Sequence, residues 1–216
     1  VIQGWYGFGY QLYISDGNPN FVLREPSGNG VSFPCTSEIG DGNWHHVAAV
    51  LNGTNVSVFI DGSIDVEGSF NNSVSGNGSD ALSFGHSPWH GNEYYPGFLG
   101  EARIWNIALS QSQVQSYIST PPAGNEEGLV GYWKFNAGEG STLYDHSGNQ
   151  NHGTINGATW VENIYGCTDS LATNYNADAN VDDGSCTYPE NGDYSLSFDG
   201  EDDYVSGSAS ISLDVS

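Results

Sequence analysis

Basic residues are nearly absent from this chain of 216 residues. Arg24, Arg103 and Lys134 stand against 26 acidic residues, and the formal net charge at pH 7 is −23. Because proteins bind nucleic-acid backbones by displacing counterions with Lys and Arg, nucleic acid is a poor partner for this chain. An anionic membrane surface is disfavoured for the same reason. The many carboxylates favour divalent cations such as calcium, although an acidic surface also serves solubility alone.

Long apolar runs are missing too. No stretch approaches the ~20 consecutive apolar residues that span a bilayer, so membrane insertion is not expected. No secretory signal peptide is present, and we expect the sequence to begin inside a domain. The 30 glycines and the 13% aromatic content instead suit many short strands joined by tight turns.

Cysteine is scarce, with three residues in the chain. Cys167 and Cys186 enclose the segment GCTDSLATNYNADANVDDGSC, and a disulfide between them closes a loop of ~20 residues, worth roughly 3 kcal/mol. A segment with so few apolar residues needs such a staple, which indicates an oxidising, extracellular or cell-surface setting. Cys35 is predicted to be a buried free thiol, or to pair with a cysteine outside this sequence.

Alternation of apolar and polar residues predicts an all-β fold. Residues 10–24 alternate around an Asp-Gly-Asn turn, and residues 43–68 alternate around Asn-Gly and Asp-Gly turns, which are typical of hairpins. After Ala108 the apolar spacing becomes that of one short helix, which Pro121 ends. Frequent turns between short strands predict a sandwich or barrel. Further strands are predicted at 81–86, 97–106, 128–136 and 154–161.

Several long motifs resemble the laminin-G-like, concanavalin A-like domains of bacterial surface proteins. They are WHHVAAV, VFIDG, GFLGEARIWNIALSQSQVQSYI and GLVGYWKFNAGEGSTLYDHSGNQNHGTINGATWV, within roughly residues 1–162. The resemblance implies a jelly-roll β-sandwich with one short helix, followed by a small disulfide-closed connector.

The order of the motifs predicts the domain organisation. Domains of this kind typically open with S-F-D-G-x-D-D-Y-V, which stands here near the end, as SLSFDGEDDYV at 195–205. We therefore expect a sandwich lacking its first strands at 1–163 and a cysteine-bracketed Asp/Asn-rich connector at 164–190. Residues 191–216 would be the first strands of the next sandwich, or strands that complete a neighbouring one. An arbitrary boundary of the sequence is the alternative.

The connector carries an oxygen-bearing side chain at every second residue. In a straight strand such residues lie ~6.6 Å apart, too far to share one calcium ion, whereas a curled backbone gives the ligand spacing of EF-hand-like loops. The segment also resembles thrombospondin type 3-like calcium-binding connectors of secreted proteins. A polar linker held by its disulfide alone is the alternative. The candidate ligands are Asp169, Asn174, Asn176, Asp178, Asn180, Asp182 and Asp183.

A second metal candidate is DHSGNQNHG at 145–153. Asp145 and its turn resemble the rim calcium site of the family, and Asp199 in the returning FDG motif would help to orient that rim. The alternative is an Asx turn, in which Asp145 bonds to its own backbone.

Aromatic residues cluster in the loop HSPWHGNEYYPG. Trp89, His90, Tyr94 and Tyr95 would either stack on sugar rings or anchor a domain contact. His45 and His46 are adjacent, so on a strand they face opposite sides and cannot share a metal, and one of them is expected in the core.

Catalysis is not expected. Glucanases of this fold carry two catalytic carboxylates in a Glu-x-Asp-x-Glu strand, and the nearest match here, residues 63–67, has Ser63 in place of the first carboxylate.

The function we expect from the sequence is therefore non-enzymatic. The chain is interpreted as a repeat of a secreted, calcium-stabilised bacterial surface adhesin or filament protein. The chain would bind adjacent repeats or subunits of its own kind, head to tail, by sharing its C-terminal strands. The alternative is a carbohydrate-binding, lectin-like module for extracellular glycans, and the fold alone does not choose between them.

Overall fold

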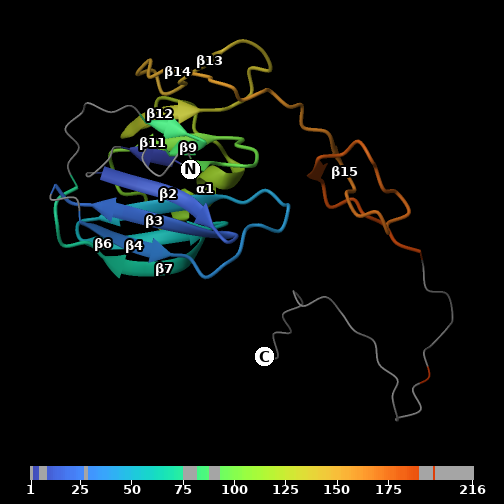
Figure 1. Cartoon of the computed structure of the whole chain (residues 1–216), viewed down its shortest axis with the longest axis horizontal. Coiled ribbons are helices and arrows are strands. Elements are labelled where there is room, and N and C mark those ends of the chain that lie inside the picture. The colour runs from blue at the N-terminus through green and yellow to red at the C-terminus, as the bar shows by residue number, and fades with distance from the viewer. Residues whose placement is uncertain are drawn as a thin grey trace. The chain divides into compact units, whose positions relative to one another are not determined.

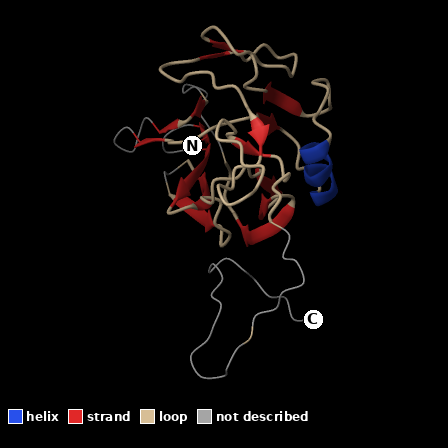
Figure 2. Cartoon of the chain, turned by 90° about the vertical axis from the view of Figure 1, so that its right-hand side faces the viewer, coloured by secondary structure: helices blue, strands red, loops and turns tan. Residues whose placement is uncertain are grey.

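The computed structural model describes residues 2–4, 9–26, 29–74, 82–87, 93–189 and 197 (Figure 1). The chain divides into two compact units, Val1–Ile164 and Tyr165–Ser216, and each is described by itself. Strands dominate the first unit, which also carries one helix (Figure 2). No helix in the described part of the chain is long and apolar enough to cross a membrane.

One layer of the first unit is a five-stranded antiparallel sheet in the order β4-β3-β2-β1-β8. The β2–β3 turn has Asp16 and Gly17 at φ of 50° and 82°, the left-handed geometry that a two-residue hairpin requires. The predicted hairpin over 10–24 is therefore confirmed. The strands are β1 (Ile2–Gly4), β2 (Gly9–Ser15), β3 (Asn18–Arg24), β4 (Gly30–Pro34) and β8 (Ser83–Phe84).

A second layer holds β5 (Val47–Asn52), β6 (Asn55–Ile60) and β7 (Ser63–Ser69), paired antiparallel in that order. Alternate residues of β6 point to opposite faces, so Val56, Val58 and Ile60 lie on its inner face. There they pack against the first layer in the main hydrophobic core. That core also contains Phe21, Leu23, Phe33, Phe70 and the buried free thiol of Cys35.

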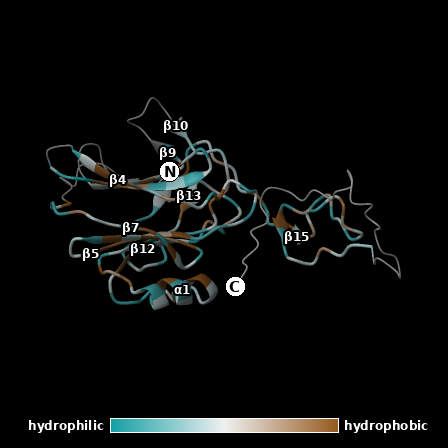
Figure 3. Cartoon of the chain, turned by 90° about the horizontal axis from the view of Figure 1, so that it is seen from below, coloured by the Kyte–Doolittle hydropathy of each residue, from teal (hydrophilic) through white to brown (hydrophobic). Residues whose placement is uncertain are grey.

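The helix among the described residues, α1 (Gln111–Ser119), begins with a capping box. The Ser110 hydroxyl accepts the Gln113 N–H at 3.3 Å, and the Gln113 side chain accepts the Ser110 N–H at 2.9 Å. Val114 is the buried residue of the helix, which lies along an outer side of the sandwich (Figure 3). The predicted short helix before Pro121 is confirmed.

The remaining strands of the first unit are short. β11 (Ala102–Trp105) pairs with β12 (Leu129–Trp133), and Ala102, Trp133 and Leu143 form a second core cluster with Phe84 packed against it. The strands predicted at 97–106 and 154–161 are shorter than expected, since Gly97 and Gly100 weaken the start of the first and Gly157, at a φ of 79°, follows the end of the second. The others are β9 (His86–Ser87), β10 (Glu93–Tyr94), β13 (Thr142–Leu143) and β14 (Gly153–Thr154).

The second unit contains the disulfide Cys167–Cys186 and one short parallel pair of strands, β15 (Tyr165–Gly166) and β16 (Val181–Asp182). The predicted disulfide is confirmed. Among the described residues of this unit, the buried apolar ones are Cys167, Ala172 and Val181, which form a very small core. The strands predicted within 191–216 lie outside the described residues.

Candidate functional site

A groove of about 630 Å³ opens over the β5-β6-β7 sheet of the first unit. The pairing register sets Val50 beside Ser57 and Ser57 beside Glu67, on the face opposite to Val56 and Val58. Side chains far apart in sequence therefore share one surface. The groove is lined by Val50, Asn52, Asn55, Val56, Ser57, Phe59, Ile64, Glu67, Gly68, Leu109 and Gln111.

Helix α1 is fixed next to this sheet by two glutamine side chains. The Nε2 atoms of Gln111 and Gln115 both donate to the Gly62 carbonyl in the β6–β7 turn, at 3.3 and 3.0 Å. Gly62 has a φ of +78°, and a Cβ atom there would lie 2.8 Å from Gln115 Cγ. The Asp-Gly sequence of the turn thus serves both the hairpin and the docking of the helix.

The lining combines apolar surface with uncharged hydrogen-bonding groups. Phe59, Ile64 and Leu109 supply apolar contacts, while amides and a hydroxyl come from Asn52, Asn55, Ser57 and Gln111. Among the described residues that line the groove, Glu67 alone is charged. A few polar groups placed over an apolar floor are characteristic of small-molecule sites.

The groove lacks the pair of carboxylates that glycoside hydrolysis needs. Residues 63–67 lie inside β7, but the Asp65 carboxylate is engaged outside the groove. It accepts bonds from the backbone N–H groups of Thr36 and Ser37 at 2.6 and 3.0 Å. With Ser63 at the first position of the pattern, Glu67 has no acidic partner among the lining residues, so the groove offers no acid/base couple.

Asp145 is buried in the loop 145–153, and its carboxylate accepts four hydrogen bonds. The donors are the backbone N–H groups of Tyr132, Ser147 and Asn151, at 2.9, 2.8 and 2.9 Å, and the Ser147 hydroxyl at 2.9 Å. Burial raises the pKa of Asp145, but these bonds outweigh burial and hold the pKa below its ordinary value.

These surroundings do not fit a cation at Asp145. Donors surround the carboxylate, and a metal ion needs acceptors there. The bond from Ser147 is the Asx turn that the sequence offered as the alternative. Calcium at this loop remains a prediction, and Asp199, its proposed helper, lies outside the described residues.

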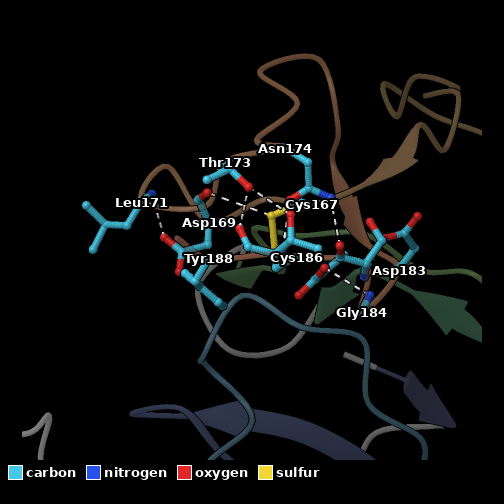
Figure 4. Close-up of a disulfide and its surroundings, with 12 residues drawn as sticks. Cys167, Asp169, Leu171, Thr173, Asn174, Asp183, Gly184, Cys186 and Tyr188 are labelled. Atoms are coloured by element: carbon cyan, nitrogen blue, oxygen red, sulfur yellow. Dashed lines mark hydrogen bonds between the residues drawn. A yellow bond between two sulfur atoms is a disulfide. The ribbon is translucent and has the colours of Figure 1, made fainter. Parts of the chain in front are cut away.

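In the connector, the candidate ligands mostly close local turns (Figure 4). The Asp169 carboxylate accepts the Leu171 N–H at 2.9 Å and the Tyr188 hydroxyl at 2.7 Å, and these bonds lower its pKa. Asp182 and Asp183 accept the N–H groups of Gly184 and Ser185, at 3.1 and 2.9 Å. The bonds from Ser185 lower the pKa of Asp183.

Two asparagines act in the same way. Asn174 ties the middle of the connector to its C-terminal part, since its Oδ1 accepts the Thr187 N–H at 2.8 Å and its Nδ2 donates to the Ser185 carbonyl at 2.7 Å. Asn176 Oδ1 accepts the Asp178 N–H at 3.1 Å. Across the described residues, no three His, Cys, Asp or Glu side chains converge as a metal centre would require. Calcium binding here remains a prediction.

Of the predicted aromatic contacts, Tyr94 is 69% exposed and stacks on His86 with ring centroids 4.8 Å apart. Tyr95 is half-buried, and its ring lies against Gly97. Trp89 and His90 lie outside the described residues. Sequence reasoning missed another exposed pair, Trp44 and Phe98, whose ring centroids are 6.4 Å apart. It also missed the groove, whose lining comes from three strands and from the segment at the start of α1.

Comparisons with known proteins agree with this fold. The sequence at 2–115 matches the family model described as the concanavalin A-like lectin/glucanases superfamily. A solved structure of a proposed carbohydrate-binding protein from Bacteroides ovatus has a TM-score of 0.58 at 17% identity, over 74% of this chain and 50% of that one. An S-layer domain-containing protein from Clostridium thermocellum has a TM-score of 0.32 at 23% identity, over 50% of this chain and 63% of that one.

No functionally curated protein matched the sequence. The chain spans half the length of the Bacteroides protein, and at such low identity the likeness concerns the fold alone. The predicted all-β sandwich with one short helix is confirmed. The matched residues make up more than half of the sequence, and the chain belongs to the concanavalin A-like lectin/glucanases superfamily.

Proposed function

We propose that this chain is a non-catalytic binding module of a secreted or surface protein, and that it holds a neutral saccharide in the groove over the β5-β6-β7 sheet. The observation that carries the proposal is the lining itself, in which amides and a hydroxyl surround an apolar floor and a single carboxylate. Sugar hydroxyls pair with such amides, and the apolar face of a pyranose ring covers apolar side chains.

Charge selects the class of saccharide. Glu67 is the charged residue of the described lining, and the chain as a whole carries a net charge of −23. A sulfated or sialylated glycan would be repelled, and the described lining offers no Lys or Arg to receive its anionic groups. We therefore expect uncharged oligosaccharides to bind and acidic ones to be rejected.

The test is a glycan array followed by calorimetry with the best neutral oligosaccharide. Glu67→Gln and Asn55→Ala should each weaken binding about tenfold, as the loss of one hydrogen bond worth ~1.4 kcal/mol predicts. Glu127→Gln, at an exposed position outside the groove, is the matched control and should bind like the unmodified protein. A glycan that binds equally well to all of these proteins would place its site elsewhere, and an empty array would remove the proposal.

A second function is favoured by the connector. A disulfide-closed segment that Asn174 also cross-links internally suits a spacer between domains, as expected for a repeat of an adhesin or filament protein. In this proposal the C-terminal residues 193–216 complete a neighbouring sandwich, and calcium stiffens the connector. Solution mass and negative-stain imaging, in calcium and then in EGTA, test it. Head-to-tail polymers that need residues 193–216 support the filament role, whereas a monomer under both conditions excludes it for this chain.

A further inference from the structure

His45 bridges two carboxylates at one end of the first unit. Its Nε2 lies 3.0 Å from Asp41 Oδ1 in the loop before β5, and its Nδ1 lies 2.8 Å from Asp61 Oδ2 in the β6–β7 turn. An imidazole donates through both nitrogens only when it is protonated. The two contacts can therefore coexist as hydrogen bonds only with a positively charged His45.

The bridge adds to backbone hydrogen bonds that already join the same two segments. Asp61 Oδ1 also accepts the His46 N–H, and the Asp61 N–H donates to the His46 carbonyl, both at 2.8 Å. On the other side, the Asp41 carboxylate accepts the backbone and side-chain N–H groups of Asn43, at 2.8 and 2.9 Å. The loop 41–46, which presents the exposed Trp44, is thereby fastened to the β6–β7 turn.

We propose that His45 is a pH-responsive clamp, which is closed as the imidazolium between Asp41 and Asp61 and opens when the ring loses its proton. The β6–β7 turn is also the anchor of α1, since Gly62 accepts the side chains of Gln111 and Gln115. Gln111 and Ile64, on either side of that anchor, line the groove. Opening the clamp should therefore loosen one end of the groove. The effect on ligand binding rests on the proposed binding function, whereas the existence of the clamp does not depend on that function.

The other charged groups near this end do not replace His45. His46 is half-buried, and desolvation together with the nearby Arg103 lowers its pKa. Arg103 is itself paired with Glu101. For His45, the hydrogen bond to Asp61, aided by Asp41, outweighs burial and raises the pKa above its ordinary value. The direction agrees with the geometry, in which two carboxylates face one ring.

The sign of the effect follows from linkage. A histidine whose pKa is raised on folding adds stability that is fully present below its unfolded pKa, and that is lost as the pH rises through its folded pKa. The clamp should thus be closed in mildly acidic solution and open in alkaline solution.

The experiment follows the imidazole nitrogens of the whole chain by NMR from about pH 5 to pH 9, with His45→Gln used to assign the signals. The expected result is a doubly protonated His45 at neutral pH that titrates above 6.5, the ordinary value for histidine. Asp61→Asn and Asp41→Asn should each lower that midpoint. Asp16→Asn is the matched control, because Asp16 occupies the corresponding Asp-Gly turn of β2–β3 at the same φ of 50°.

A neutral His45 at pH 7, or a midpoint at or below 6.5, would overturn the proposal. So would equal midpoints in the unmodified protein and in Asp61→Asn. Backbone amide signals of Ile64 and Gln111 should follow the His45 titration, and they should lose this response in His45→Gln. Because these readings need no saccharide, a failure of glycan binding would leave the clamp standing, and a failure of the clamp would leave glycan binding untouched.

Discussion

Replacing Asp145 with alanine should be among the most damaging single changes in the first unit. Its carboxylate is buried and accepts three backbone N–H groups, from Tyr132, Ser147 and Asn151, as well as the Ser147 hydroxyl. Alanine removes the acceptor but leaves the donors in place. The loop cannot easily turn outward to water, since Asn149 and Asn151 also hold the Val130 carbonyl.

The expected cost follows from the number of stranded donors. An unsatisfied buried donor costs ~1–3 kcal/mol. The bond from the Tyr132 N–H is buried, whereas those from Ser147 and Asn151 are part-buried, so we expect a loss of about 3 kcal/mol in the free energy of unfolding. For a unit of this size, each kcal/mol lowers the melting temperature by about 2–4 °C. Asp145→Ala should therefore melt about 6–12 °C lower than the unmodified protein.

Calorimetry and urea unfolding measure this cost. Glu139→Ala, which removes an exposed carboxylate from the same unit, controls for the change in net charge and should have little effect. A cost below about 1 kcal/mol would show that water or a shifted backbone replaces the carboxylate, and the reasoning would fail. If EDTA destabilised the unmodified protein as much as the substitution does, a bound cation rather than the hydrogen bonds would explain the role of Asp145.

The same carboxylate predicts a response to acid. Because its pKa is lowered on folding, Asp145 contributes stability that is present above the unfolded pKa of ~3.9 and is lost as the pH falls through its folded pKa. Melting temperatures between about pH 2 and pH 6 should therefore fall more steeply for the unmodified protein than for Asp145→Ala.

Three further predictions concern the cysteines and calcium. The Cys35 thiol, whose pKa burial and Asp65 raise to about 11, should react with a thiol reagent at neutral pH only upon unfolding, as labelling across a urea series would show. Reducing Cys167–Cys186 should cost the second unit roughly 3 kcal/mol and abolish the hydrogen-exchange protection of the Thr187 amide, whereas the first unit keeps its melting temperature. If the connector binds calcium, adding CaCl2 should shift the amide signals of the connector at 178–184 while the Asp145 amide stays in place. Unchanged amide signals in both segments would rule out calcium binding at the connector and at the Asp145 loop.

The sequence predicts the hairpins well because turn chemistry and alternation agree there. Asp16-Gly17 and Asp61-Gly62 adopt the left-handed turns that two-residue hairpins need, and these turns fix which residues pair. Once the register is fixed, alternation decides which side chains enter the core. The helix was equally readable, since its apolar spacing and the prolines after it specify the same segment.

The groove could not be read in this way. It depends on the register shift between Val58 and Phe59, which displaces Glu67 and Ile64 relative to β6. It also depends on Leu109 and Gln111, which reach the sheet from a segment more than 40 residues further along the chain. Contacts of this kind depend on three-dimensional docking, and no local pattern carries them.

The Asp/Asn-rich motifs were ambiguous for a different reason. Metal ligands and Asx turns use the same side chains at the same spacing, because both present an oxygen to groups two residues away. What distinguishes them is whether the oxygens converge on one point or turn back to successive N–H groups. Asp145, Asn176 and Asp182 turn back, and this depends on backbone dihedral angles that the residue types do not determine.

The shortage of Lys and Arg residues leads to a final prediction, which concerns the effect of salt on stability. With a net charge of −23, the folded chain stabilises several carboxylates through N–H and O–H donors in place of Lys and Arg, as at Asp65, Asp145 and Glu126. Such hydrogen bonds are short-ranged and little affected by ionic strength, whereas repulsion among the exposed carboxylates is screened within about 10 Å at 0.1 M salt. Raising NaCl from about 20 mM to about 500 mM should therefore raise the melting temperature of the first unit, because the repulsion that salt removes exceeds the few ion pairs that it weakens. A fall in melting temperature would contradict this reasoning. It would mean that ion pairs such as Arg103–Glu101 and the His45 bridge stabilise the fold by more than the repulsion among carboxylates destabilises it.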